Sequence, residues 1–485
     1  MISKKLISIF HLAILFLFIT TSTFAGTQNE NKVSGFFEKI KSDPNSLRLF
    51  FAKMPKGGDL HHHLSGSVYA ETYLDLAYRK NLYVDIDEFI LQKSIAEDEL
   101  GKKRTLLVKD ALKLFGMRDK LIDSWSIRNF HPGKDSSHKH FFSTFFRFSA
   151  GYMGNEAEIL AILDNRATQE NVQYLETMIN LPREQSETER ISESFKWENP
   201  EEPQADFEKL YKLFHSSGLS SIVSKANERV ERFDKNRIKV CQKRNFKCNT
   251  LIRYKTFGLR FLDKTKVFAQ LVLAYEIAKT NPLVVGVNFV APEDNYHALR
   301  DYELHMQMFQ FLNKKYPEIN LSLHAGELNL ELVKPEELLC HIEKAVKMAG
   351  AKRIGHGVSI IYEPNYQKTI EYMSDKKVAV EVPLTSNEFI LGVKGRAHPF
   401  MIYYQNDVPI VLSTDDAGVF RTDLTQQFVI AAHRYRRVNY EGIKKFVYNS
   451  IEYSFLDKQD KKNLRDLLDK KFREFEANTV TENKL

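Results

Sequence analysis

The 485-residue chain has only three cysteines, one long apolar run and a small net charge, and each shortage limits what the protein can be. Three cysteines allow at most one disulfide within the chain. Beyond the single apolar run, no stretch is a candidate membrane span. A formal net charge of +7 is too small to indicate nucleic-acid binding on its own. With 43% hydrophobic and 27% charged residues, the composition is typical of one large globular domain or two smaller ones.

The long apolar run lies at the N-terminus and has the pattern of a secretory signal peptide. Residues 1–5 carry two lysines, residues 6–19 are almost wholly apolar, and Thr23 and Ala25 are small residues at the −3 and −1 positions of a cleavage site. An uncleaved anchor is the alternative, but about 14 apolar residues are short for a hydrocarbon core of ~30 Å. We therefore expect a signal peptide over residues 1–25. The mature chain is then exported to the periplasm or the extracellular space, without stable membrane insertion.

The positions of the cysteines are compatible with such a compartment. Cys241 and Cys248 lie close together in a polar stretch, whereas Cys340 lies in the apolar helical pattern ELLCHIEKAV. In an oxidising compartment we expect a Cys241–Cys248 disulfide and a buried free thiol at Cys340. The alternative is three unpaired thiols.

Eight short runs with strand character recur along the chain, separated by helical patterns such as residues 264–279, 297–315, 335–349 and 366–376. Eight alternating units of this kind predict an α/β fold, the (β/α)₈ TIM barrel. A doubly wound sheet is the alternative, but it would not bring the polar ends of the first, fifth, sixth and eighth strands together at one site. The runs are LHHHLSG at 60–66, then 172–180, 250–254, 284–292, 321–327, 353–357, 378–387 and 409–416.

Two segments are expected to lie outside the barrel, which we assign to residues 56–485. Residues 26–55 have helical periodicity and predict an N-terminal helical extension. Residues 85–139, after the first βα unit, have mixed polarity and no clear strand pattern. They predict an insertion of helices and loops, followed by a strongly aromatic helix over 140–152.

The polar residues at the strand ends have the chemistry of a hydrolytic zinc site. Alternate strand side chains point to the same face, so His61 and His63 can bind one ion together. With His324 and Asp415 they provide the N and O ligands that a catalytic Zn²⁺ prefers, one ion per chain. A metal-bound water becomes acidic enough to react at neutral pH.

Three further side chains lie beside these candidate ligands. Glu327 follows His324 on a strand-to-loop turn and is the candidate general acid. His356 and Asp416 are candidates to orient the attacking water, as a base or as electrostatic partners. Structural explanations also exist, namely a turn histidine for His356, a helix N-cap for Asp416 and a surface carboxylate for Glu327.

The motifs that carry these residues resemble those of the adenosine deaminase family, within the metal-dependent amidohydrolase superfamily. They are MPKGGDLHHHLSGS, SLHAGEL, RIGHGV and VLSTDDAGVF, and the resemblance extends from about residue 54 to 424. It implies hydrolytic deamination of adenosine, and of 2′-deoxyadenosine, to inosine and ammonia. In this role Glu327 protonates the ring nitrogen next to C6, Asp416 hydrogen-bonds the attacking water, and His356 steadies it.

The signal peptide, the MPKG segment and the insertion look more like the secreted, growth-factor-related branch of that family. The sequence departs from the family at two positions near the substrate. Ser65 stands where members often have an aspartate that binds the ribose 5′-hydroxyl, and Ala291 stands where a glycine NH meets the purine. Glu293 and the aromatic residues 141–148 are further candidates to line the pocket.

Several functions remain open after this comparison. One is a secreted adenosine-binding or growth-factor-like protein, and another is a deaminase of a related adenine compound. The PCxxC pair of zinc deaminases that act on polynucleotides is absent, which favours a free nucleoside over nucleic acid. The fourth strand has no lysine to bridge a second metal, which disfavours amide or phosphoester hydrolysis. A homodimer is possible, but the sequence does not determine the oligomeric state.

Because Ser65 stands in place of an aspartate that would bind the ribose 5′-hydroxyl, we predict that the protein discriminates weakly between substrates with and without that hydroxyl. A site built around a hydrogen bond rejects an analogue lacking it by ~10⁴ or more, whereas a site without that bond cannot. We expect 5′-deoxyadenosine and adenosine to have similar kcat/KM values in a steady-state assay of ammonia release. A 5′-deoxyadenosine value orders of magnitude lower would mean that another residue binds the hydroxyl.

Overall fold

The computed structural model describes residues 27–94, 104–133, 135–198 and 202–485. The predicted signal peptide lies outside these residues. Within them, no helix has both the length and the apolar character needed to cross a membrane.

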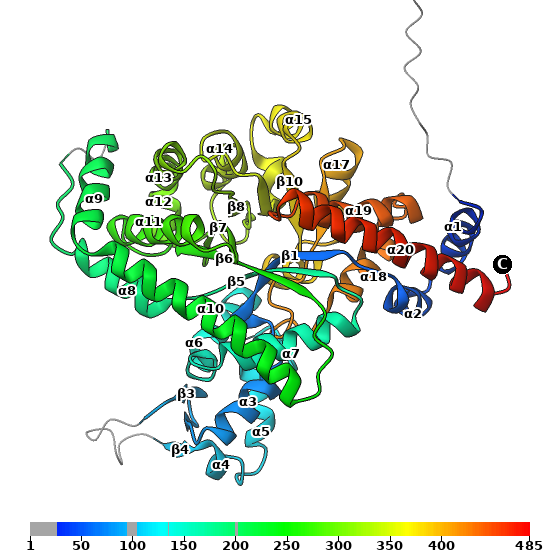
Figure 1. The fold of residues 1–485 in the computed structure, drawn as a ribbon, viewed down its shortest axis with the longest axis horizontal. Coiled ribbons are helices and arrows are strands. Elements are labelled where there is room, and N and C mark those ends of the chain that lie inside the picture. Colours follow the sequence, from blue (N-terminus) through cyan, green and yellow to red (C-terminus); the bar gives the residue numbers. More distant parts are fainter. Residues whose placement is uncertain (1–26, 95–103, 134, 199–201) are drawn as a thin grey trace, which may run out of the picture.

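The centre of the molecule is a parallel (β/α)₈ barrel (Figure 1). Two four-stranded parallel sheets, of order β1-β5-β6-β7 and β11-β10-β9-β8, form its wall. Single bridges join the sheets at both seams, His62 to Asp415 and Val287 to Leu321. All eight predicted strands are confirmed. Their bounds are β1 Gly58–His63, β5 Tyr174–Met178, β6 Leu251–Leu259, β7 Val284–Val290, β8 Ser322–Ala325, β9 Arg353–His356, β10 Ala379–Val382 and β11 Ile410–Leu412.

Helices surround the barrel and bury apolar faces against it. The longest of the barrel-facing helices, α11, is buried on nearly every side because α8, α10 and α13 cover its outer face. Aspartate or asparagine side chains cap several helix N-termini, as Asp263 does for α11. Apart from α4 and α5 of the insertion, the α-helices described after β1 are α3 Ala70–Arg79, α6 Ser137–Tyr152, α7 Glu156–Gln169, α8 Pro182–Ile191, α9 Gln204–Ser216, α10 Leu219–Lys243, α11 Lys264–Thr280, α12 Tyr296–Arg300, α13 Tyr302–Lys315, α14 His341–Lys347, α15 Tyr366–Lys376, α16 Leu384–Leu391, α17 Phe400–Gln405, α18 Leu424–Arg434, α19 Tyr440–Glu452 and α20 Lys458–Glu482.

The N-terminal extension is helical, as predicted. It consists of α1, Gln28–Ile40, and α2, Pro44–Lys53, which lie beside the C-terminal helices (Figure 1). An aromatic cluster joins them to the rest of the chain. The Phe50 ring lies 5.1 Å from that of Phe475 and 6.1 Å from that of Tyr440. Because such ring pairs add to the burial energy, the extension is an integral part of the core.

The insertion differs from the prediction of helices and loops alone. It contains a three-stranded antiparallel sheet of order β3-β2-β4, in which β2 is Tyr83–Asp85, β3 is Ile90–Gln92 and β4 is Thr105–Leu107. Two short helices follow, α4, Val108–Ala111, and α5, Met117–Ser124. Strands of three residues are too short to give a recognisable alternation of polar and apolar residues, which is why the sequence pattern missed them. The aromatic helix α6 is confirmed.

The barrel interior contains buried charges as well as apolar side chains. The Arg353 guanidinium binds Glu176 from β5 and Glu381 from β10, and all three side chains are buried. Lys255 donates to Leu60 O at 2.6 Å and to Ser322 Oγ at 3.3 Å. Each buried charge thus has polar partners, which such groups need in a folded interior.

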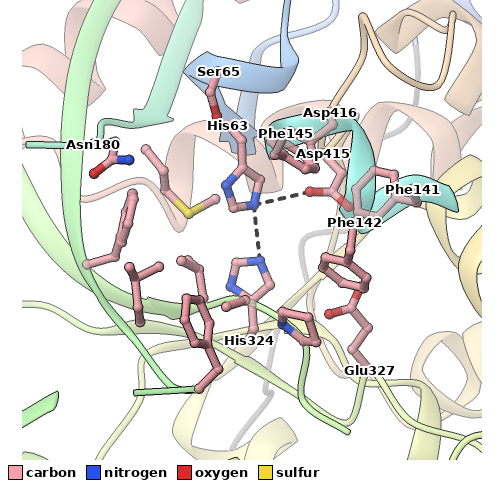
Figure 2. A pocket seen from close by; sticks show the side chains of 17 residues that line it. His63, Ser65, Phe141, Phe142, Phe145, Asn180, His324, Glu327, Asp415 and Asp416 are labelled. Carbon is pink, nitrogen blue, oxygen red and sulfur yellow. Dashed lines mark hydrogen bonds and ion pairs between the residues drawn. The ribbon is translucent and has the colours of Figure 1, made fainter. Parts of the chain in front are cut away.

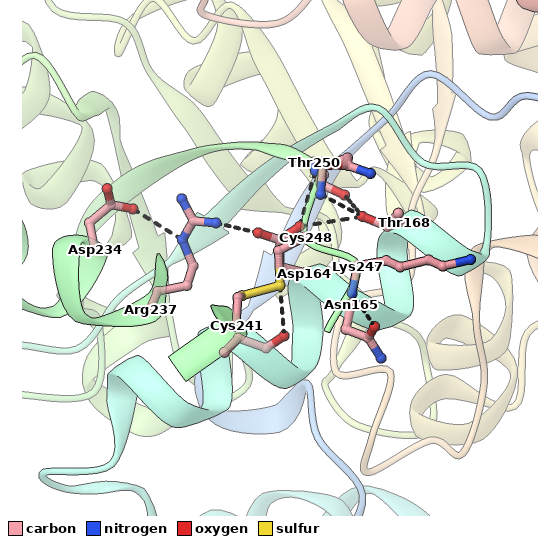
Figure 3. The surroundings of a disulfide bond; sticks show 11 residues. Asp164, Asn165, Thr168, Asp234, Arg237, Cys241, Lys247, Cys248 and Thr250 are labelled. Atoms are coloured by element: carbon pink, nitrogen blue, oxygen red, sulfur yellow. Dashed lines mark hydrogen bonds and ion pairs between the residues drawn. A yellow bond between two sulfur atoms is a disulfide. The ribbon is translucent and has the colours of Figure 1, made fainter. Parts of the chain in front are cut away.

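A Cys241–Cys248 disulfide connects the end of α10 to the segment before β6, as predicted (Figure 3). Next to it, Asp164 accepts a hydrogen bond from Thr250 N at 3.0 Å and pairs with Arg237. Cys340 is a free thiol, but it is only half-buried rather than buried. Its position just before the α14 N-terminus leaves part of the side chain open to solvent.

We expect Cys241→Ser/Cys248→Ser to lower the free energy of unfolding by about 2 kcal/mol, because the disulfide restricts the unfolded chain. Thermal melts of the double variant and of Cys340→Ser would measure the difference. Equal melting temperatures for the double variant and the native chain would show that the bond adds no stability.

Candidate active site

A cavity of about 380 Å³ opens at the carboxyl ends of the barrel strands (Figure 2). This is the end at which (β/α)₈ enzymes place their catalytic residues. Its polar lining residues come from strand ends, and most of its apolar lining comes from α6 and from the ends of β6 and β7. The polar ones are His63, Ser65, Asn180, His324, Glu327, Asp415 and Asp416, and the apolar ones are Phe141, Phe142, Phe145, Met178, Phe257, Leu259, Phe261, Val290, Ala291 and Pro292.

Four predicted metal ligands converge at the base of this cavity. His63 Nε2 lies 3.2 Å from His324 Nε2 and 3.2 Å from Asp415 Oδ1, as Figure 2 shows. His61 Nε2 lies 3.5 Å from the same Asp415 oxygen. Ligand atoms ~2.1 Å from a tetrahedral Zn²⁺ are ~3.4 Å apart, so these separations fit a single ion.

Outer hydrogen bonds orient the histidines toward that point. His61 Nδ1 donates to Glu381 Oε2 at 2.8 Å, and His324 Nδ1 donates to Asn288 Oδ1 at 2.9 Å. Because a carboxylate or amide oxygen only accepts, the proton lies on Nδ1 and Nε2 keeps its lone pair for a metal. Neither Glu381 nor Asn288 was predicted, because an isolated polar residue on an apolar strand has no motif.

The charge distribution at this point favours a cation. Burial, with His61 adding to it, holds the pKa of His324 well below its usual range, so this imidazole is neutral. Burial opposes charge on Asp415, but the neighbouring imidazoles of His61 and His63 hold its pKa well below the usual range. A carboxylate among imidazole nitrogens is a donor set that suits Zn²⁺.

The predicted general acid, Glu327, lies at the edge of this group. Its Oε1 is 3.6 Å from His356 Nε2, and its Oε2 is 3.4 Å from an Arg260 nitrogen. Burial raises the pKa of Glu327 well above its usual range, although Arg260 opposes the shift. A protonated carboxyl beside the predicted metal ligands can donate a proton to a molecule bound in the cavity.

His356 and Asp416 complete the predicted set. His356 Nδ1 bonds to Asn387 Oδ1 at 2.8 Å, while burial lowers the His356 pKa to about 4. Among the described residues, His356 Nε2 and Asp416 Oδ1 are buried and have no hydrogen-bond partner. A Cβ on Gly66 would lie 1.8 Å from Asp416 Oδ1, so only glycine at 66 lets this carboxylate reach its position.

The three predicted substrate-binding residues have different placements. Ser65 and Ala291 line the cavity. Ala291 has a φ of 87°, in the left-handed region that favours glycine. This backbone conformation is the one expected for the glycine that the adenosine deaminase motifs have at this position. Glu293 is not among the lining residues and lies behind Glu327, where it accepts hydrogen bonds from backbone amides. The sequence missed Arg260, which contacts Glu327 and the carbonyls of Ala291 and His324.

Comparison with known proteins identifies relatives of this chain. The family model for adenosine deaminase matches residues 260–471. The chain is 31% identical over 178 residues to an adenosine deaminase of Clostridium kluyveri, covering 36% of this chain and 46% of the relative. It is 27% identical over 192 residues to one of Clostridium perfringens, covering 39% and 54%. The chain thus spans about half the length of the relatives it matches.

Solved structures with low sequence identity share the fold. An amidohydrolase from Burkholderia ambifaria with bound Zn superposes with a TM-score of 0.56 at 17% identity, covering 90% of this chain and 94% of that one. An adenine deaminase from Arthrobacter aurescens gives 0.52 at 16%, covering 86% and 99%. An N6-methyl-AMP deaminase from Arabidopsis thaliana gives 0.52 at 17%, covering 87% and 98%.

The family model begins after His61 and His63, yet the barrel brings both histidines to the ligands that lie within the matched segment. The sequence match and the shared fold therefore agree with the geometry of the strand ends. Over residues 260–471 this chain is similar to adenosine deaminases, and it shares the fold of an amidohydrolase with bound Zn.

Proposed function

We propose that the protein is an exported, zinc-dependent aminohydrolase that converts adenosine and 2′-deoxyadenosine to inosine or 2′-deoxyinosine and ammonia. The observation that carries the proposal is the convergence of His61, His63, His324 and Asp415 beside Glu327 in one cavity. Export is supported by the N-terminal sequence pattern alone.

The reaction adds water across C6 of the purine and expels the amino group. Zinc, when held by the four ligands, supplies a Lewis acid that brings the pKa of a water down to about 7. Asp416 Oδ1 and His356 Nε2 are the buried groups available to hydrogen-bond that water and accept its proton. Glu327 donates a proton to the ring nitrogen next to C6 as the water oxygen bonds to C6. The group that accepted the water proton passes it to the amino group, the C6–N bond breaks and ammonia leaves, while the C6 hydroxyl returns a proton to Glu327 and becomes the carbonyl of the product.

The remaining cavity wall favours an uncharged substrate. Phe141, Phe142 and Phe145 from α6 line it, together with Phe257 from β6 and Phe261 just after β6. Aromatic rings of this kind pack well against a purine. No lysine or arginine is among the described residues that line the cavity, so a 5′-phosphate would have no cation to pair with. We therefore place adenosine and 2′-deoxyadenosine ahead of AMP, although one structural neighbour is an N6-methyl-AMP deaminase.

A substrate panel tests this function. The purified mature chain, with zinc added, is assayed for ammonia release from adenosine, 2′-deoxyadenosine, adenine and AMP. We expect turnover of the two nucleosides and a much lower kcat/KM for AMP. A preference for adenine or AMP would identify a deaminase of a related compound, and binding of adenosine without ammonia release would favour a secreted binding protein.

Substitution of the proposed general acid should have a different effect from substitution of a proposed metal ligand. Glu327→Gln keeps the side-chain size but removes the donated proton, and we expect kcat to fall ~10²–10⁴-fold with zinc content unchanged. His324→Ala removes a ligand, and we expect it to lose zinc as well as activity. Steady-state kinetics and metal analysis of both variants distinguish the two roles. Retention of more than about a tenth of kcat in Glu327→Gln would contradict the acid role.

The carboxylate behind His61 should tune the zinc affinity. Glu381→Gln removes the charge that orients His61, and we expect zinc affinity to fall ~10–100-fold in a chelator competition assay. Glu476→Gln is the matched control. Glu476 is also a buried glutamate in an ion pair, but its partner is Lys444 and both residues lie in the C-terminal helices α19 and α20. Equal zinc affinity in the native chain and Glu381→Gln would rule out this function of Glu381.

A further inference from the structure

Glu293 is a fully buried carboxylate that has no part in the reaction as described. It follows β7, and its two oxygens accept hydrogen bonds from two consecutive backbone amides. Gly326 N donates to Oε1 at 3.1 Å, and Glu327 N donates to Oε2 at 2.7 Å. These amides form the turn that carries the Glu327 side chain.

His341, the first residue of α14, holds Glu293 from the other side. His341 Nδ1 donates to Glu293 Oε1 at 2.5 Å. The His341 ring stacks on Tyr302 with centroids 3.7 Å apart, and the Tyr302 hydroxyl donates to His341 O at 2.7 Å. The imidazole is therefore fixed both by stacking and by the backbone of its own residue.

The turn has no room to shift toward this helix. Gly326 has a φ of 76°, and a Cβ there would lie 2.7 Å from the Ile342 side chain of α14. Arg260 limits movement on another side, with one guanidinium nitrogen 3.5 Å from Glu293 Oε2 and another 3.4 Å from Glu327 Oε2. Although burial opposes charge, Arg260 and His341 lower the pKa of Glu293 to about 2, so it accepts from all these donors as a carboxylate.

We propose that Glu293 and His341 form a clamp that positions the Glu327 carboxyl for proton transfer. The clamp joins the ends of β7 and β8 to the N-terminus of α14, so Glu327 is held by two elements besides its own strand. Both members are positioning residues, since neither lines the cavity. The inference rests on the proposed function in taking Glu327 as the general acid. A misplacement of about 1 Å can reduce the rate ~10²-fold, which is the effect that the clamp prevents.

Glu293→Gln tests the clamp with little change in volume. Its amide NH₂ replaces one acceptor and faces a backbone N–H, so the turn must move. We expect kcat for adenosine to fall ~10–100-fold, while KM changes less than about threefold and the zinc content stays at the native level. A crystal structure of the variant should show the Glu327 carboxyl displaced by about 1 Å.

A second variant and a control separate positioning from general loss of stability. His341→Phe keeps the ring that stacks on Tyr302 but removes the donor to Glu293, and we expect a smaller loss of kcat with the same unchanged zinc content. Glu363→Gln is the control, because Glu363 accepts from the Ile342 amide at the same end of α14 without contacting the Glu327 turn. We expect this control to lower the melting temperature and to keep kcat near the native value.

The outcomes distinguish the clamp from the proposed function. A native chain that releases no ammonia from adenosine refutes the function, and the crystallographic position of Glu327 in Glu293→Gln then decides the clamp alone. An active native chain with kcat in Glu293→Gln within twofold of it would overturn the clamp. So would an equal loss of kcat in Glu363→Gln, because the effect would then come from α14 as a whole.

Discussion

The buried ion pair network inside the barrel is the constraint on which the site depends. Arg353 binds Glu176 and Glu381, all three side chains are buried, and Glu381 also accepts hydrogen bonds from His61 and Ser322. Removing one partner of a buried pair costs about 3–5 kcal/mol, because the other charge is left without compensation. The orientation of the first predicted metal ligand is therefore tied to the stability of the barrel. An apolar core would hold the strands equally well, but it would not fix the tautomer of His61.

The strand ends turn sharply to bring their side chains into the cavity. Ala291, His356 and Asp415 all have positive φ values, of 87°, 69° and 59°. Such conformations cost of order 1–3 kcal/mol for residues other than glycine, and they persist where the surroundings determine them. Ala291 follows β7 directly, His356 ends β9, and Asp415 lies three residues past the end of β11, where its backbone N–H donates to His61 O. The strain is thus concentrated where the chain changes direction at the mouth.

The sequence predicts the barrel and the residues that carry the chemistry, because both leave a local signature. His61 and His63 share a face through the period of a strand, and most of the other barrel strands lie in apolar runs. The residues that orient the site histidines leave no such local signature. Glu381, Asn288 and Asn387 are single polar residues, and their role depends on contacts with histidines far away in the sequence. Glu293 follows a strand end as a pocket residue would, but the turn at Ala291 directs it behind Glu327.

The aromatic helix α6 forms one wall of the cavity, although it belongs to the long connection between β1 and β5 and supplies none of the proposed metal ligands. Its rings pack on one another and on neighbouring aromatics such as Phe420, so the wall is built independently of the strand ends. Substitutions on α6 can therefore alter which substrate fits while the reactive centre is conserved. The proposed reactive centre and the wall that shapes the space for a substrate thus come from separate parts of the chain.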